Sequence, residues 1–100
     1  MNKLIHEQSR LKILTLLATG KNAVPFTTMR DGLAMTGGNL SIQLKTLEEA
    51  GMIATEKYFA DNKPRTDITI TQEGRDALME YLEELESLLA GLRAGKGTEK

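Results

Sequence analysis

The segment from residue 36 to residue 53 places the strongest constraint on the fold of this chain. It opens with the helix-breaking pair Gly37-Gly38, continues with leucines at spacing i, i+4 and i+7, and reaches Gly51. That spacing puts the leucines on one face of a helix, and a glycine after the last apolar residue is a typical stop signal. We therefore predict a short amphipathic helix whose inward face is formed by Leu40, Leu44, Leu47 and Ala50.

The opposite face of this predicted helix begins with small, uncharged side chains. A helix with small polar groups at its N-terminal end can enter the DNA major groove without steric obstruction. Its free N-terminal amides also favour a nearby phosphate. An ordinary amphipathic helix is the alternative interpretation, and the neighbouring segments favour DNA. The outward residues are Gly38, Ser41, Ile42, Lys45, Thr46 and Glu49.

Composition limits the protein to one ordinary globular domain. The chain has 100 residues, of which 40% are hydrophobic and 27% charged. Cysteine is absent, which excludes disulfides and thiolate metal sites and suits a reducing cytoplasm, the location we expect. No apolar run is long enough to cross a membrane, and no signal peptide is evident.

Charge is distributed unevenly along the chain, although the net charge is only −1. Residues 1–65 contain nine Lys and Arg against six Asp and Glu, whereas residues 66–100 contain four against eight. A mildly basic body followed by an acidic helix is compatible with DNA on one side of the molecule only.

The first third of the chain predicts two further helices. Apolar residues surround much of the segment Leu4 to Ala18, which indicates one central, buried helix. Pro25 restricts the segment 24–26 to a short edge strand. Thr27 or Thr28 can cap a helix over residues 29–35, and the turn at 36–38 then leads into the helix described above. Helix, tight turn and second helix is the order of a helix-turn-helix.

A β-hairpin follows, with strands at 52–60 and 65–71 and a turn cluster at 61–64. Alternation places Ile53, Thr55, Lys57 and Phe59 on one face of its first strand. Its tip carries Asn62, Lys63 and Arg65. Such cations are ordinary surface residues in most proteins. After a candidate recognition helix they become candidate phosphate or minor-groove contacts.

Thr71 is the expected cap of a long last helix over residues 72–92, followed by a flexible tail at 93–100. The apolar stripe of this helix exceeds what one small domain needs, so we predict that it pairs with a second subunit. Packing within the subunit is the alternative, which we favour for Leu78 and Leu82. The predicted dimer contacts, including the start of the first helix, are Leu4, Ile5, Leu78, Tyr81, Leu82, Leu85, Leu88, Leu89 and Leu92.

Four sequence pieces resemble the small MarR/ArsR-like winged helix-turn-helix transcriptional regulators of bacteria that carry a C-terminal dimerisation helix. They lie at 5–14, 38–51, 63–66 and 71–75, and the resemblance extends to about residue 90. It implies a homodimer whose recognition helix reads a half-site. Within that helix, the amide of Gln43 is suited by its hydrogen-bonding groups to adenine. The metal-sensing relatives use cysteine and histidine clusters, and this chain has no cysteine and only His6, so we expect no metal and assign His6 a structural or solvent role. A small-molecule effector would have to sit at the dimer interface.

The sequence therefore predicts a mainly α, α+β protein, in which residues 1–92 form a three-helix core with a β-hairpin wing and a long C-terminal helix. We expect a homodimeric, sequence-specific DNA-binding regulator, most simply a repressor on a pseudo-palindromic operator. A winged helix used for protein contacts is the alternative. With no nucleophile–base constellation and no P-loop, neither an enzyme nor a cofactor is predicted. The expected DNA-binding residues are Thr28, Gly38, Asn39, Ser41, Ile42, Gln43, Lys45, Thr46, Asn62, Lys63 and Arg65.

Overall fold

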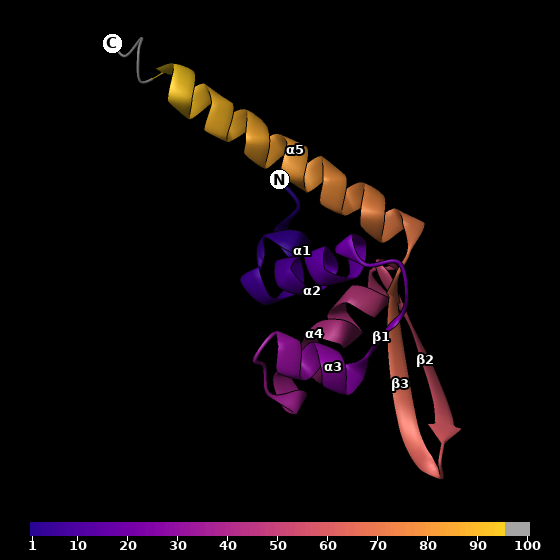
Figure 1. Ribbon diagram of the computed structural model, residues 1–100. Coiled ribbons are helices and arrows are strands. Elements are labelled where there is room, and N and C mark those ends of the chain that lie inside the picture. Colours follow the sequence, from indigo (N-terminus) through magenta and orange to yellow (C-terminus); the bar gives the residue numbers. More distant parts are fainter. Residues whose placement is uncertain (96–100) are drawn as a thin grey trace.

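The computed structural model describes residues 1–95 as a small helical body with two extensions (Figure 1). A long helix and a β-hairpin leave the body at opposite ends, and the largest dimension is 65 Å. The predicted fold class is confirmed. The elements, in order, are α1 (Lys3–His6), α2 (Gln8–Thr19), β1 (Val24–Pro25), α3 (Phe26–Gly32), α4 (Gly37–Glu49), β2 (Ile53–Ala60), β3 (Lys63–Ile70) and α5 (Gln72–Gly95).

One hydrophobic core lies between α2, α4, the sheet and the first half of α5. The inward leucines of α4 are buried as predicted, with Leu44 slightly exposed at the edge of the core. The buried side chains of the described residues are almost all aliphatic, so the core is held mainly by apolar packing. Its fully buried large side chains are Ile5, Ile13, Leu14, Met29, Leu40, Leu47, Ile68 and Leu78.

The prediction of one unbroken helix over residues 4–18 is wrong, because the chain breaks at Glu7. Asn2 caps α1 by accepting hydrogen bonds from the amides of Leu4 and Ile5. Glu7 then takes an extended conformation, and its carboxylate accepts from the amide of Arg10 at 3.0 Å as the N-cap of α2. A side chain that satisfies the free amides of a new first turn makes a separate helix favourable.

The second predicted helix is displaced in sequence. It starts at Phe26, with Pro25 before it and no side-chain cap, and ends at Gly32 rather than at residue 35. Its C-terminus is closed by two hydrogen bonds, from the Met35 amide to the Arg30 carbonyl and from the Ala34 amide to the Asp31 carbonyl. This is a Schellman motif, and it places Ala34 in the left-handed region with φ of 54°.

The helix α4 begins earlier than the double glycine suggested. Thr36 is its N-cap and accepts from the Asn39 amide at 3.1 Å, so Gly37 and Gly38 form the first helical turn instead of the preceding turn. At the other end, Gly51 has φ of +77° and terminates the helix. The predicted stop signal is confirmed, since glycine adopts that conformation without the steric cost of a Cβ atom.

The sheet is antiparallel with strand order β1-β3-β2, and β1 is the short edge strand that Pro25 allows. β2 and β3 pair from Ile53 with Ile70 to Ala60 with Lys63. Asp61 and Asn62 both have positive φ, as a two-residue type I′ hairpin turn requires. The wing is therefore confirmed, with a shorter turn than predicted because Lys63 already belongs to β3.

Thr71 joins the hairpin to α5. Its hydroxyl donates to the Gly51 carbonyl at 2.6 Å and accepts from the Gly74 amide at 3.0 Å, which confirms the predicted cap. The helix continues to Gly95, beyond the predicted end at residue 92, and the remainder of the predicted tail lies outside the described residues. Within residues 1–95, no helix has the length and apolarity needed to span a membrane.

Candidate nucleic-acid interface

The outward face of α4 is open, and its first turns are uncrowded. Gly38 has no heavy atom near the position of a Cβ atom, and Asn39 and Ser41 are exposed. Ile42 is 63% exposed, although isoleucine is normally buried. Lys45 follows one turn later. The face presents an amide, a hydroxyl, an aliphatic group and a cation in succession, which are the kinds of side chain that contact base edges and phosphates.

Gln43 and Thr46 differ from these residues because they are half-buried and already hydrogen-bonded. The Thr46 hydroxyl donates back to the Ile42 carbonyl at 3.1 Å. The Gln43 Oε1 accepts from the Arg10 guanidinium at 2.8 Å, and its Nε2 donates to the Asn39 Oδ1 at 3.2 Å. Both ends of the Gln43 amide are thus engaged within the protein, at the side of the outward face.

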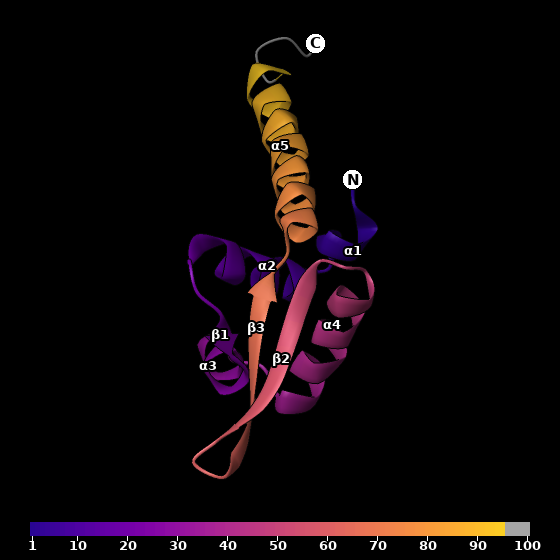
Figure 2. The same cartoon turned by 90° about the vertical axis from the view of Figure 1, so that its right-hand side faces the viewer.

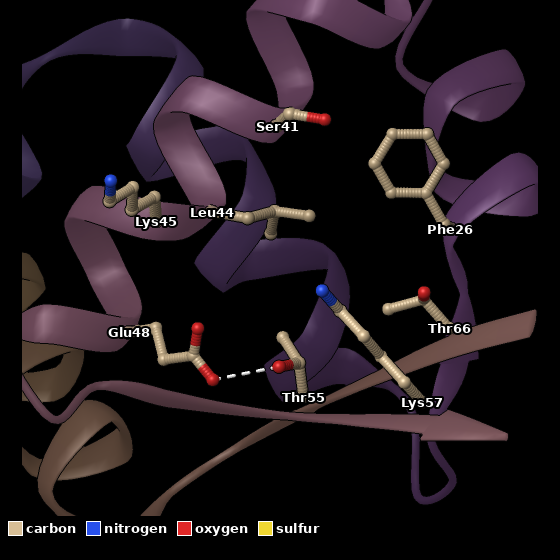
Figure 3. Close-up of a pocket in the computed structure, with 8 residues that line it drawn as sticks. All are labelled: Phe26, Ser41, Leu44, Lys45, Glu48, Thr55, Lys57 and Thr66. Carbon is tan, nitrogen blue, oxygen red and sulfur yellow. Dashed lines mark hydrogen bonds between the residues drawn. The ribbon is translucent and has the colours of Figure 1, made fainter.

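A groove of about 410 Å³ separates α4 from the wing (Figure 3). Leu44 forms part of its apolar lining, and the Thr55 hydroxyl donates to the Glu48 carboxylate across it at 2.7 Å. The Lys57 ammonium points into the groove from β2. The groove is lined by Phe26, Ser41, Leu44, Lys45, Glu48, Thr55, Lys57 and Thr66, drawn from α3, α4 and the two wing strands.

The wing tip lies beyond the ends of α3 and α4 (Figure 2). Asn62, Lys63 and Arg65 are all exposed there, as predicted for surface residues of a hairpin tip. Phe59 is 77% exposed and pairs with Pro64 across the hairpin. The tip therefore combines two cations with an exposed aromatic ring. These side chains lie beyond the end of α4, so they can contact parts of a partner molecule that α4 cannot reach.

Tyr58 and Asp67 are hydrogen-bonded to each other on the opposite face of the wing. The Tyr58 hydroxyl donates to the Asp67 Oδ2 at 3.1 Å. Because only the protonated phenol can donate this hydrogen bond, the bond raises the pKa of Tyr58 above its usual value of 10.0. Desolvation and the negative charge of Asp67 raise this pKa further. Tyr58 therefore remains a neutral donor throughout the physiological pH range.

Comparison with known proteins identifies the family. Residues 9–89 match the winged helix DNA-binding domain family. The chain belongs to this family. The winged helix also aligns with an uncharacterized protein of Methanocaldococcus jannaschii, at 37% identity over 83 residues, which are 83% of this chain and 89% of the relative. The predicted resemblance to winged helix-turn-helix transcriptional regulators is confirmed.

Solved winged-helix structures have the same arrangement. A transcriptional regulator homologue from Pyrococcus horikoshii OT3 superimposes with a TM-score of 0.83 at 31% identity, covering 89% of this chain and 87% of that one. A MarR-family transcriptional regulator from Enterococcus faecalis V583 superimposes with a TM-score of 0.71 at 24% identity, covering 95% and 84%. The second likeness concerns the fold alone.

Within this winged helix, α4 is the recognition-helix candidate, and the residues considered next lie outside it. Thr28 is exposed in the short α3. Of the predicted dimer contacts, Ile5, Leu78 and Tyr81 lie in the core of the subunit, with at most 4% of each exposed. Leu4, Leu82 and Leu85 are half-buried, and the exposed residues are Leu88, Leu89 and Leu92. His6 makes a structural contact, as expected, through a hydrogen bond of 3.0 Å between its Nδ1 and the Tyr81 hydroxyl.

Three residues of this region were not among the predicted DNA contacts. Lys57 lines the groove between α4 and the wing, and Phe59 lies two residues further along β2, exposed near the hairpin tip. The alternation of the first strand had already placed both on one face with Ile53 and Thr55. That alternation was the sequence signal that could have added Lys57 and Phe59 to the predicted interface. Arg10 lies 33 residues from Gln43 in sequence, and no local pattern links the two.

Proposed function

We propose that this protein is a sequence-specific transcriptional regulator that binds double-stranded DNA as a homodimer. The observation that carries the proposal is the open outward face of α4, which lies beside a wing with three exposed cations, Lys57, Lys63 and Arg65. A helix of this kind fits the major groove, and a hairpin beside it can follow the phosphate backbone into the adjacent minor groove.

Two copies would pair through the uncovered half of α5. The apolar stripe that buries Leu78 and Tyr81 inside the subunit continues outward along the same helix face to Leu88, Leu89 and Leu92. A two-fold axis through that stripe would bury it in both subunits at once. The pairing would set two α4 helices roughly 34 Å apart, one turn of DNA, which corresponds to a pseudo-palindromic operator.

Repression by occupancy is the simplest output of such a dimer. Phosphate contacts from Lys45, Lys63 and Arg65 would position the protein and supply much of its affinity, and the first turns of α4 would read the bases. An effector, if the protein has one, would act at the dimer interface by changing the distance between the two recognition helices.

The test is a salt titration on a duplex selected from random DNA, measured by fluorescence anisotropy. Because Lys63 and Arg65 would each displace a counterion, the double variant Lys63→Ala/Arg65→Ala should weaken binding and reduce the log–log salt slope by about 2. The matched control is Lys21→Ala, an exposed lysine in the loop before β1, which should leave the slope unchanged.

The wild-type slope separates the two candidate functions. DNA binding predicts a log–log slope of several, since several phosphates are neutralised together. A duplex affinity that is absent, or that does not change with salt, would contradict the proposal and indicate a protein partner for the winged helix instead. Equal slopes for the wild type and the double variant would remove the wing from the DNA contact.

A further inference from the structure

A chain of three hydrogen-bonded side chains connects the N-terminal helices to the first turn of α4. The Arg10 Nε donates to the Leu4 carbonyl of α1 at 2.7 Å, and its Nη1 donates to the Gln43 Oε1 at 2.8 Å. The Gln43 Nε2 then donates to the Asn39 Oδ1 at 3.2 Å, one helical turn earlier. Arg10 and Gln43 are half-buried, whereas Asn39 is exposed.

The direction of every bond in this chain is set by Arg10. A guanidinium carries only donors, so the Gln43 atom facing it must be the carbonyl oxygen. The Gln43 amide nitrogen consequently faces Asn39, and the Asn39 atom that meets this nitrogen must again be an oxygen. Two side-chain amides that could each be rotated by half a turn in isolation are therefore fixed in one orientation.

The consequence lies at Asn39, whose side-chain NH2 group has no hydrogen-bond partner within residues 1–95 while its Oδ1 is directed along the helix to Gln43. An asparagine that pairs with adenine uses its oxygen and its nitrogen together, on N6 and N7. Because Oδ1 is directed along the helix towards Gln43, Asn39 presents its NH2 donors to the groove. The base edge that offers two acceptors and no donor is that of guanine, through O6 and N7.

We propose that Asn39 reads a guanine in each half-site as a donor, and that Arg10 and Gln43 are positioning residues that set this preference. The inference rests on the proposed DNA-binding function. It differs from the expectation that Gln43 itself reads adenine, because Gln43 is committed to its two protein partners. Arg10 specifies a base without contacting DNA, through the orientation of two amides.

Gln43→Glu is the decisive substitution, since it changes one nitrogen to an oxygen at nearly constant shape. Its carboxylate still accepts from Arg10 with one oxygen but presents the other oxygen to Asn39. Asn39 must then donate to it, so its amide rotates and turns Oδ1 outward. An outward acceptor pairs with the donor groups of adenine N6 or cytosine N4. We expect the preference for guanine at that position to fall by about tenfold or more.

The experiment is selection of bound duplexes from random DNA, run in parallel on the wild type, Gln43→Glu, Arg10→Lys and Arg10→Met, with thermal unfolding of each variant. Lysine also carries only donors, so Arg10→Lys should retain guanine. Arg10→Met removes the constraint and should give mixed guanine and adenine. A purely structural role for Arg10 would instead lower the affinity for all sequences and leave the base preference unchanged.

Failure of the inference can be separated from failure of the proposed function. If the wild type enriches no duplex, the DNA-binding proposal itself is contradicted. If the wild type enriches a half-site that lacks the guanine, or if Gln43→Glu enriches the same base as the wild type, only the assignment of Asn39 is overturned. Should Gln43→Glu not fold, Asn39→Asp serves in its place, because an acceptor-only side chain must lose guanine if the inference holds.

Discussion

Ala34 has a left-handed backbone conformation, with φ of 54°, at the end of α3. For an L-residue with a Cβ atom this region costs roughly 1–2 kcal/mol, whereas glycine adopts it freely. Ala34→Gly should therefore raise the free energy of unfolding by about 1 kcal/mol, measured by urea denaturation at fixed protein concentration.

Ala50 is the matched control, because it ends α4 in the ordinary right-handed region with φ of −85°. At this position glycine relieves no strain and only increases the conformational entropy lost on folding. Ala50→Gly should therefore lower the free energy of unfolding by about 0.5–1 kcal/mol. The same sign for both substitutions would contradict the assignment of strain to Ala34.

At the scale of elements, the packing of α5 against the hairpin depends on a close approach at Gly74. A Cβ atom at this position would lie 2.1 Å from the Met52 carbonyl oxygen and 2.9 Å from the Ile70 side chain. Backbone cannot give way as a flexible side chain can. Gly74→Ala should therefore destabilise the protein by about 3 kcal/mol, at the upper end of overpacking effects.

Gly91 provides the comparison on the same helix, since a Cβ atom there would have no neighbour within 4 Å. Gly91→Ala should stabilise α5 by about 0.5–1 kcal/mol through helix propensity alone. Thermal unfolding monitored by circular dichroism distinguishes the two variants. A Gly74→Ala protein as stable as the wild type would mean that α5 can shift away from β2 at little cost.

At the scale of the whole molecule, dimerisation through α5 would decide whether two recognition helices act together. Leu88→Glu introduces a charge at the start of the uncovered stripe, where Leu88 is 59% exposed in the single chain. We expect a folded monomer in sedimentation equilibrium. Operator affinity should fall by about 100-fold or more, because the second half-site no longer binds at high effective concentration.

Met79→Glu is the control for this prediction, since Met79 is 55% exposed on the same helix but lies about 100° away from the stripe. Its replacement should leave both the mass and the affinity unchanged. If Leu88→Glu remains a dimer, the subunits pair through another surface, and the spacing of the half-sites would no longer follow from α5.

Local sequence patterns were sufficient for the identity and order of most elements. The leucines of α4 recur at helical spacing, β2 alternates, and Thr71 stands before an acidic first turn, so each segment carries its own structural signal within a few residues. The fold class and most of the exposed positions of α4 and the wing followed from these patterns, because both sides of an amphipathic segment are encoded in its periodicity.

Only the tertiary structure decided which part of an apolar helix face is buried, and by which neighbouring element. Leu78 and Leu89 belong to the same face of α5, yet one is buried and the other exposed, because the body of the subunit ends between them. Likewise, Arg10 fixes the amide of Gln43 although 33 residues separate them in the chain. Periodicity shows that a face is apolar or polar, but the contacts that bury or orient it come from residues distant in sequence, and these are set by packing.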